Sequence, residues 1–326
     1  MGQTEHSEYY SSPESYFESY ESKIESFEDL NNKLNDLVKN NPSIDFVWRG
    51  QSDSSWGLKS SLYRALDPGN DGNLNEDKLN AAEKSILKSA RKNWRMYNKS
   101  ALEIFAAIQH HGGVTRLLDV TLNPYIATWF AVESNMDKDS RLFALSKHPE
   151  RSDSKDILNL EINSEHLNSY MPFWHSWDKS ESKTNNWGTG NGWRIWVPPT
   201  YNSRILAQNA AFLIDGVPIA LESTAPYYKV KGAGHNKNWK IRDIRSSSSI
   251  HVRLYNPDES ESDRQKGRRK KTVTPRKFPP TFNFRITKDA KPEIKKMLEK
   301  TFGYTNSLIY PDILGLSEYT KLNILS

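Results

Sequence analysis

The segment from Gln109 to Thr121 constrains the fold most, because it places polar side chains between two apolar parts of the chain. A helical pattern over about 101–110 precedes it, and Pro124 opens a second apolar helix after it. The Gly112-Gly113 pair is expected to end the first helix, and Val114 to Val120 is typical of a buried strand. Polar residues are seldom buried for packing alone. The segment therefore predicts a helix, a turn, a strand and a second helix that together present functional side chains.

Other apolar runs and amphipathic patterns along the chain predict an α+β fold. The run Ile44 to Trp48 is typical of a strand that presents Arg49 at its end. Further strands are expected over about 141–145, 211–214 and 282–286, and helices over about 79–94 and 293–298. We expect one mixed, mostly antiparallel split sheet with flanking helices, in a strand order that the sequence leaves open.

The chain is predicted to form one domain over residues 14–326, behind a disordered acidic tail of residues 1–13. Apolar residues recur every three or four positions from Phe17 to Leu37, which predicts an amphipathic N-terminal helix over 14–41. An aromatic loop region over 170–201 holds five of the ten tryptophans, namely Trp174, Trp177, Trp187, Trp193 and Trp196. These indoles are expected to pack over a thin core or, alternatively, to stack on bases or on a nicotinamide.

Charge is distributed unevenly along the chain, although the formal net charge is only +5. Residues 1–30 hold eight acids against Lys23 alone, whereas residues 264–277 hold eight bases and no acid. Such a basic block favours polyanions through counterion release, and the alternative is a solvated loop. We expect a basic insertion over 256–277 whose nucleic-acid contacts come from Arg268, Arg269, Lys270, Lys271, Arg276 and Lys277.

Several classes of protein are disfavoured by missing signals. The chain has no cysteine, and its adjacent His110 and His111 lack partners at ligand spacing, so we expect neither a disulfide nor a metal site. It has no Gly-x-Ser-x-Gly elbow and no glycine-rich phosphate loop. No apolar run approaches the roughly 18 residues of a membrane span, and the N-terminus is acidic. A cytoplasmic protein that makes no membrane contact is expected.

A set of spaced motifs resembles the FRG domain family, which is named for a Phe/Tyr-Arg-Gly signature. The motifs are Phe46-Val-Trp-Arg-Gly-Gln51, Trp56-x-Leu58, Ser61-Leu-x-Arg64, the Gln109 to Thr121 segment with Pro124, Ala127, Phe130 and Ala131, Arg204-x-x-x-Gln208-x-x-x-Phe212, Lys295, Leu298 and Tyr310-Pro-Asp-x-x-Gly-Leu316. The resemblance spans roughly residues 15–320. Trp48 in place of Phe or Tyr, Ala210-Ala211 in place of a glycine, and the 256–277 insertion depart from the family pattern.

The order of these motifs also resembles that of ADP-ribosyltransferases of the arginine-serine-glutamate kind. The resemblance implies that Arg49 anchors the diphosphate of NAD, that Thr121 takes the place of the Ser-Thr-Ser strand, and that Gln208 lies where an acid usually polarises the ribose. Asp119 and His110 are candidate general bases. The other residues expected to bind NAD, with Arg49, are Gly50, Gln51, Gln109, Thr115 and Arg116. The implied function is an NAD-dependent ADP-ribosyltransferase that acts as a toxin or antiphage-defence effector, modifies nucleic acid, with RNA favoured, and has a possible neutralising antitoxin protein.

Three questions stay open at the level of the sequence. A neutral Gln208 stabilises positive charge poorly, and Glu222, Asp215 or Glu83 could supply the missing carboxylate. Arg49 and Asp119 could instead form a buried structural ion pair capped by Arg116, and Arg64 and Trp56 are expected to be structural. The alternative functions are a non-catalytic nucleic-acid-binding module and a hydrolase of nucleotides or nucleic acid that uses His110 and Asp119.

Overall fold

The computed structural model describes residues 7–148, 169–198, 203–222, 224, 228, 230, 237–262 and 278–323. The six basic residues that were expected to contact nucleic acid lie outside the described residues: Arg268, Arg269, Lys270, Lys271, Arg276 and Lys277.

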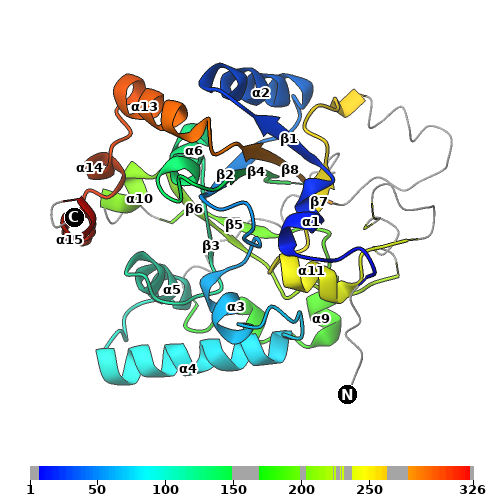
Figure 1. Cartoon of the computed structure of the whole chain (residues 1–326). Helices are drawn as coiled ribbons and strands as arrows, with labels where there is room; N and C mark the ends of the chain where they lie inside the picture. The colour runs from blue at the N-terminus through cyan, green and yellow to red at the C-terminus, as the bar shows by residue number, and fades with distance from the viewer. Residues whose placement is uncertain are drawn as a thin grey trace.

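One sheet runs through the centre of the molecule (Figure 1). Its strands are β1 (Glu21–Ile24), β2 (Phe46–Gln51), β3 (Leu118–Thr121), β4 (Ser140–Ser146), β5 (Arg194–Trp196), β6 (Ala210–Ile214), β7 (Arg253–Tyr255) and β8 (Pro280–Ile286). They pair in the order β1-β8-β4-β2-β3-β6-β5, and β7 also pairs with β8. Only the β1 and β7 pairings to β8 are parallel. The predicted mixed, mostly antiparallel sheet is therefore confirmed.

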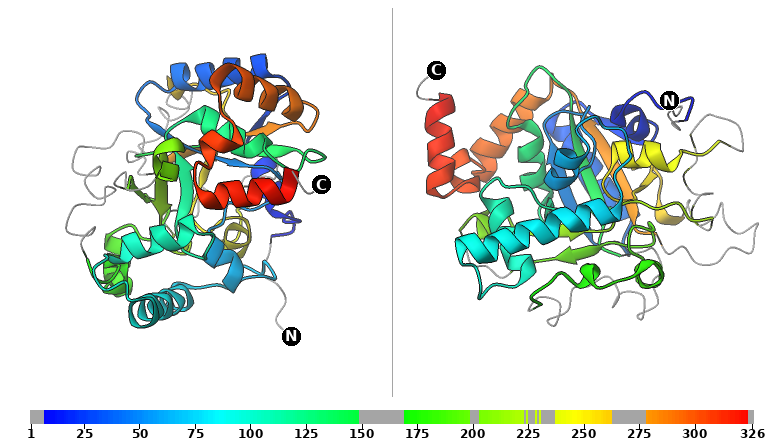
Figure 2. Two further views of the ribbon diagram at one scale, coloured as in Figure 1. Left: turned by 90° about the vertical axis from the view of Figure 1, so that its left-hand side faces the viewer. Right: turned by 90° about the horizontal axis from the view of Figure 1, so that it is seen from below.

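Helices cover both faces of this sheet (Figures 1 and 2). They are α1 (Pro13–Glu18), α2 (Phe27–Asn40), α3 (Ser61–Leu66), α4 (Glu76–Trp94), α5 (Ala101–His110), α6 (Pro124–Val132), η1 (Phe173–His175), α9 (Lys179–Thr184), α10 (Ser203–Ala207), α11 (Ile241–Ser247), α13 (Lys291–Phe302), α14 (Asn306–Ile309) and α15 (Ile313–Asn323). Apolar residues of α2, α6 and α13 pack on one face, against Trp48, Leu142 and Phe284. Residues of α1 and α11 pack on the other face, against Val47 and Phe143. The alternation of Val47 and Trp48 between the two cores follows the strand period of two.

The predicted N-terminal helix over 14–41 is not continuous. Strand β1 separates α1 from α2, and it pairs with β8 from Glu21 opposite Asn283 to Ile24 opposite Ile286. Ser26 then starts α2, because its hydroxyl accepts a hydrogen bond from the Asp29 amide at 3.0 Å. The apolar spacing fitted a helix, but pairing with the sheet overrode that local preference.

The tail that was expected to be disordered is described from Ser7 onward. The Ser7 amide donates to both carboxylate oxygens of Asp243 at 3.0 Å, and Ser12 caps α1. This contact joins the start of the described chain to α11.

The tryptophans of the 170–201 region pack into the core. Trp174, Trp187, Trp193 and Trp196 are each at most 3% exposed. Trp174 and Trp187 stack with their ring centroids 5.2 Å apart, beneath α4 and α5. The packing interpretation is confirmed for these four residues, which have no open ring face to offer to a base.

In the part of the chain that the structure describes, no helix combines the length and the apolar character needed to cross a membrane.

Candidate functional site

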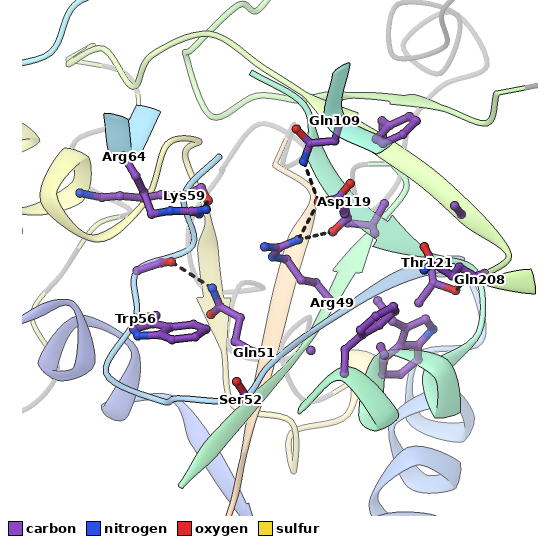
Figure 3. A pocket seen from close by; sticks show the side chains of 18 of the residues that line it. Arg49, Gln51, Ser52, Trp56, Lys59, Arg64, Gln109, Asp119, Thr121 and Gln208 are labelled. Carbon is purple, nitrogen blue, oxygen red and sulfur yellow. Dashed lines mark hydrogen bonds and ion pairs between the residues drawn. The ribbon is translucent and has the colours of Figure 1, made fainter. Parts of the chain in front are cut away.

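A cavity of about 880 Å³ lies where β2, β3 and β6 meet the ends of α3, α5, α6 and α10. Eight residues predicted for the site line it, namely Arg49, Gly50, Gln51, Gln109, His110, Asp119, Thr121 and Gln208. Six of them are labelled in Figure 3, all except Gly50 and His110. Concave sites for small ligands commonly enclose about 300–1,000 Å³. The segments around Arg49 and Asp119 therefore converge on one site large enough for a dinucleotide.

The cavity exists because β2 and β3 separate almost as soon as they meet. Trp48 opposite Thr121 is the single paired position between the two strands. Beyond it, β2 continues along β4, with Arg49 opposite Phe143, while β3 pairs with β6. Arg49 lies inside β2 and not at its end as predicted, and its side chain points into the gap.

Gly50 allows α6 to close the other side of the strand. A Cβ atom at this position would lie 1.8 Å from the carbonyl oxygen of Ala127 and 2.7 Å from the amide nitrogen of Ala131. Only a residue without a side chain permits this contact between strand and helix. The Arg-Gly pair thus combines a guanidinium on the cavity side with close helix packing next to it.

Arg49 is held by the backbone, and its charge is not neutralised by a buried acid. Its Nη1 donates to the main-chain oxygen of Asp119 at 2.6 Å and lies 3.8 Å from the carboxylate Oδ2 of that residue. The Asp119 side chain is 56% exposed. The Nε of Arg49 has no hydrogen-bond partner among the described residues. Burial lowers the pKa of Arg49, Asp119 opposes that effect, and the nearby Arg64 adds to it. Arg49 and Asp119 therefore do not form the buried structural ion pair that was the alternative, because the Asp119 carboxylate is exposed.

A second guanidinium faces Arg49 from α3. Arg64 donates through Nη1 to the main-chain oxygen of Lys59 at 2.6 Å, and it forms no ion pair with a carboxylate of the described chain. Lys59 is paired with Asp67 at 3.8 Å, and burial lowers the pKa of Lys59 to about 8. Trp56 also lines the cavity and is 48% exposed. Arg64 and Trp56, which were expected to be structural, are thus part of the cavity wall.

Gln109 connects the end of α5 to the Asp119 carboxylate. Its Nε2 donates to Oδ2 of Asp119 at 2.8 Å, and its Oε1 accepts from the hydroxyls of Thr115 at 2.7 Å and Ser61 at 3.2 Å. Thr115 is fully buried and does not line the cavity. Its role is to fix the orientation of the Gln109 amide.

His110 lies beside Asp312, with Nε2 at 3.6 Å from Oδ2. Burial lowers the pKa of His110, and the neighbouring Arg204 and His111 lower it further. The Asp312 carboxylate opposes this lowering, so the two effects on the neutral form of the imidazole act in opposite directions.

Arg116 points away from the cavity, contrary to its predicted role in binding NAD. Its guanidinium bonds to Glu83 at 2.8 Å and to Glu76 at 2.6 Å, and it lies beside the stacked rings of Trp174 and Trp187. This pairing raises its pKa despite burial. Arg116 thus belongs to a buried structural network, separate from the Arg49 site.

None of the three carboxylates proposed for the reaction lines the cavity. Glu83 is fully buried and bound by Arg116 and by the Trp174 indole at 2.9 Å. Asp215 accepts from the amides of Gly188 and Gly216, and burial raises its pKa to about 7. Glu222 also lies outside the cavity lining.

Thr121 and Gln208 form one wall of the cavity and are bonded to each other. The Thr121 hydroxyl donates to the main-chain oxygen of Gln208 at 2.7 Å, and the Gln208 amide donates to the Ile309 carbonyl at 3.1 Å. With its amide nitrogen engaged in this way, Gln208 has a clear structural role in attaching α14 to the cavity wall.

Glu133 is a cavity residue that the sequence did not reveal. Its carboxylate accepts a hydrogen bond from the Tyr310 hydroxyl at 3.1 Å, and both residues line the cavity. Burial raises the pKa of Glu133 to about 7, against the opposing effects of Tyr310 and Lys295. The sequence offered one indication of this residue: Glu133 follows directly after the apolar helix α6, where an acid interrupts a run of buried residues.

Arg204 is a further cavity cation, which the sequence indicated only as a motif position. It binds Asp312 through Nη2 at 2.6 Å, and its guanidinium lies 5.1 Å from the Tyr310 ring centroid.

No cluster of three or more metal-ligating side chains occurs among the described residues.

Fold and site together define an α+β protein whose central sheet opens between two strands onto an arginine-lined cavity. Residues 44–140 match the FRG domain, so the chain carries a domain of this family. The matched range runs from the approach to β2 to the start of β4 and includes Arg49, Arg64, Gln109 and Asp119. Neither the curated proteins nor the solved structures contain a match to this chain.

Proposed function

We propose that this FRG protein is an NAD-dependent ADP-ribosyltransferase whose cavity binds NAD as a substrate. The observation that carries the proposal is the cavity itself, in which two guanidinium groups from Arg49 and Arg64 face a half-exposed Asp119 carboxylate. The opening of the sheet between β2 and β3 also agrees with the split sheet expected of such enzymes.

The diphosphate of NAD is assigned to Arg49 and Arg64. Guanidinium groups bind phosphate oxygens through paired N–H donors, and both arginines line the cavity, where Arg64 forms no ion pair with a described carboxylate. Trp56 offers an exposed indole on which the adenine or nicotinamide ring can stack. Gln51, whose Nε2 donates to the Gly57 carbonyl at 3.0 Å, fixes the loop that carries Trp56.

In the proposed reaction, the bond between C1′ of the ribose and the nicotinamide nitrogen breaks, and the electron pair leaves with nicotinamide, which becomes neutral. The positive charge that develops on the ribose is stabilised by the Asp119 carboxylate, held in place by Gln109 and Arg49. An acceptor hydroxyl or amine then forms a bond to C1′. Its proton passes to the Glu133 carboxylate, whose raised pKa suits a general base near neutral pH.

We further propose RNA as the acceptor, because the basic residues of segment 264–277 favour a polyanion. The proposed biological role is that of a toxin or antiphage-defence effector controlled by an antitoxin protein. Both suggestions follow from the charge pattern and from the family resemblance.

The decisive experiment is to incubate the purified protein with NAD labelled in its adenylate half and with RNA, DNA or protein acceptors. We expect label to transfer to RNA, and the Arg49→Ala variant to lose about 100-fold or more of that activity, because it removes a positioned phosphate ligand. Lys296→Ala, on the exposed side of α13, is the control. Release of nicotinamide without transfer would identify an NAD hydrolase, and absence of NAD turnover in the wild-type protein would refute the proposal.

A further inference from the structure

An aromatic surface outside the cavity lies at the C-terminal end of α4. Trp94 is 71% exposed, Tyr97 is 58% exposed and Tyr170 is 60% exposed. Helix α4 forms the outer edge of the molecule on this side of the sheet (Figures 1 and 2). Large aromatic side chains that are left in solvent together mark a binding surface more often than a packing defect.

The same surface is strongly basic. From Lys84 to Leu102 the chain carries six cations and no acid. Lys84, Lys88 and Lys92 follow one another at intervals of four, so they form a row along one side of α4. All three are exposed, as are Arg95 and Lys99, and none of the five forms an ion pair with a described residue. We refer to these five cations and the three aromatic residues as the α4 surface.

Arg91 attaches Tyr170 to the C-terminal part of α4. Its guanidinium carbon lies 3.5 Å from the ring centroid of Tyr170, and its Nη2 donates to the Tyr170 carbonyl. Arg91 is only 5% exposed and covers one face of the Tyr170 ring, so the remaining exposed area of that ring faces solvent. Trp94 follows Arg91 by three positions on α4 and is therefore its neighbour on the helix surface. Trp94 therefore lies on the same stretch of the α4 surface as the Arg91–Tyr170 pair.

We infer that the α4 surface binds single-stranded nucleic acid. A row of unpaired cations attracts the phosphate backbone, and exposed aromatic rings stack on bases, which only an unpaired strand presents. An acidic peptide would use the cations and leave the rings unused. A duplex would contact the cations but offers no free base face to Trp94 or Tyr170.

The α4 surface and the cavity lie at opposite ends of α5. Ala101 begins that helix beside the α4 surface, and Gln109 and His110 end it at the cavity. A helix of ten residues is about 15 Å long. The inference does not depend on the proposed transfer reaction, because strand binding is measured without NAD.

The test is fluorescence anisotropy of the full chain with three labelled probes of one sequence: a twelve-nucleotide single-stranded RNA, the same sequence as single-stranded DNA, and the DNA duplex. We expect Trp94→Ala to weaken binding of both single strands about tenfold and to leave duplex affinity nearly unchanged, since stacking on one aromatic contributes about that much. Tyr319→Ala, which removes an exposed aromatic residue from α15, is the matched control. The RNA and DNA probes separate recognition of the 2′-hydroxyl from recognition of the strand alone.

The cations are tested separately through the dependence of affinity on salt. Lys88→Glu with Lys92→Glu should reduce the slope of log affinity against log salt by about 0.7 for each phosphate that these lysines neutralise in the wild-type protein. Lys296→Glu with Lys300→Glu makes the same charge change on α13 and should leave the slope unchanged. Every variant retains segment 264–277, so its contribution cancels in the comparison. Unchanged single-strand affinity in Trp94→Ala, or equal losses for single strands and duplex, would overturn the inference.

Discussion

At the scale of single residues, the site depends on which charged groups are left without a buried partner. Arg116 and Glu83 neutralise each other in the interior, whereas the Asp119 carboxylate near Arg49 remains open to the cavity. A charged group that is fully paired and desolvated contributes to structure, and one that is held but accessible can act on a ligand. This difference separates Arg116 from Arg49 although both are arginines beside polar motif residues.

Glu133→Gln tests the proposed base. Burial raises the pKa of Glu133 to about 7, so the carboxylate that accepts a proton is present mainly above that pH. We expect the transfer rate of the wild-type protein to rise from pH 6 to pH 8, and the variant to lose about 100-fold of the rate together with this rise. The measurement is a pH–rate profile of ADP-ribose transfer.

A second readout of Glu133 does not depend on activity. The folded state retains the proton of this carboxyl at pH values where the unfolded chain has lost it, between the ordinary pKa of 4.5 and about 7. Stability of the wild-type protein should therefore fall as pH rises through that window. Glu133→Gln should remove this part of the fall, whereas the exposed Glu293→Gln should not. A pH–rate profile that keeps its rise in Glu133→Gln would exclude this residue as the base.

At the scale of elements, the contact between β2 and α6 fixes the geometry of the cavity. The added methyl of Gly50→Ala would meet the backbone of Ala127, which cannot move without shifting α6. Overpacking of this kind costs about 1–3 kcal/mol. We expect Gly50→Ala to lower the free energy of unfolding in urea by at least this amount and to weaken NAD binding.

Gly69→Ala is the matched control for Gly50→Ala, because its added methyl meets only the side chain of Asp71. The two substitutions have the same effect on the entropy of the unfolded chain. Equal stability of the two variants would show that α6 adjusts freely to a side chain at position 50.

The positions of several helices and strands could be predicted from the sequence. Helix α5 and strand β4 lie where apolar periodicity placed them, because both are largely buried and their patterns are strong. Helix periodicity failed before residue 27, where β1 pairs with a strand more than 250 positions away, from Glu21 to Asn283. No local pattern encodes such a partner.

The candidate site was also only partly predictable, because some of its contacts join residues that are distant in the sequence. Arg49, Asp119 and Gln109 were found because they follow or flank apolar elements, and the structure brings them to one cavity. The direction of Arg116 depends on the loop between Gly113 and Leu118, whose path is set by contacts with α3 and α4. Glu133 was missed because its partner, Tyr310, comes from the far end of the chain.

At the scale of the whole molecule, a network of charges joins the N-terminal segment to the sheet. Arg141 is completely buried and bonds to Glu21 at 2.9 Å and to Asn283 at 2.6 Å. Arg285 bonds to Glu21 at 2.5 Å and to Glu14 at 2.6 Å. Two acids of the N-terminal stretch are thus used to neutralise arginines of the sheet.

Glu21→Gln should destabilise the whole fold, because it leaves the Arg141 guanidinium buried beside a neutral partner. Breaking a buried ion pair in this way costs about 3–5 kcal/mol. Glu25→Gln removes an exposed acid from the same segment and should change stability by less than about 0.5 kcal/mol. Thermal and urea unfolding of the two variants measure the difference. A Glu21→Gln protein as stable as the wild type would show that the N-terminal segment does not hold the sheet together.

The walls of the cavity come from distant parts of the chain, from Arg49 on β2 to Tyr310 after α14. During translation the ribosome makes β2 early, but the wall formed by Arg204, Gln208 and Tyr310 emerges much later. A nascent chain that stops before Tyr310 has no closed site in which to hold its ligand. The cavity is therefore complete only after the chain has been synthesised as far as Tyr310.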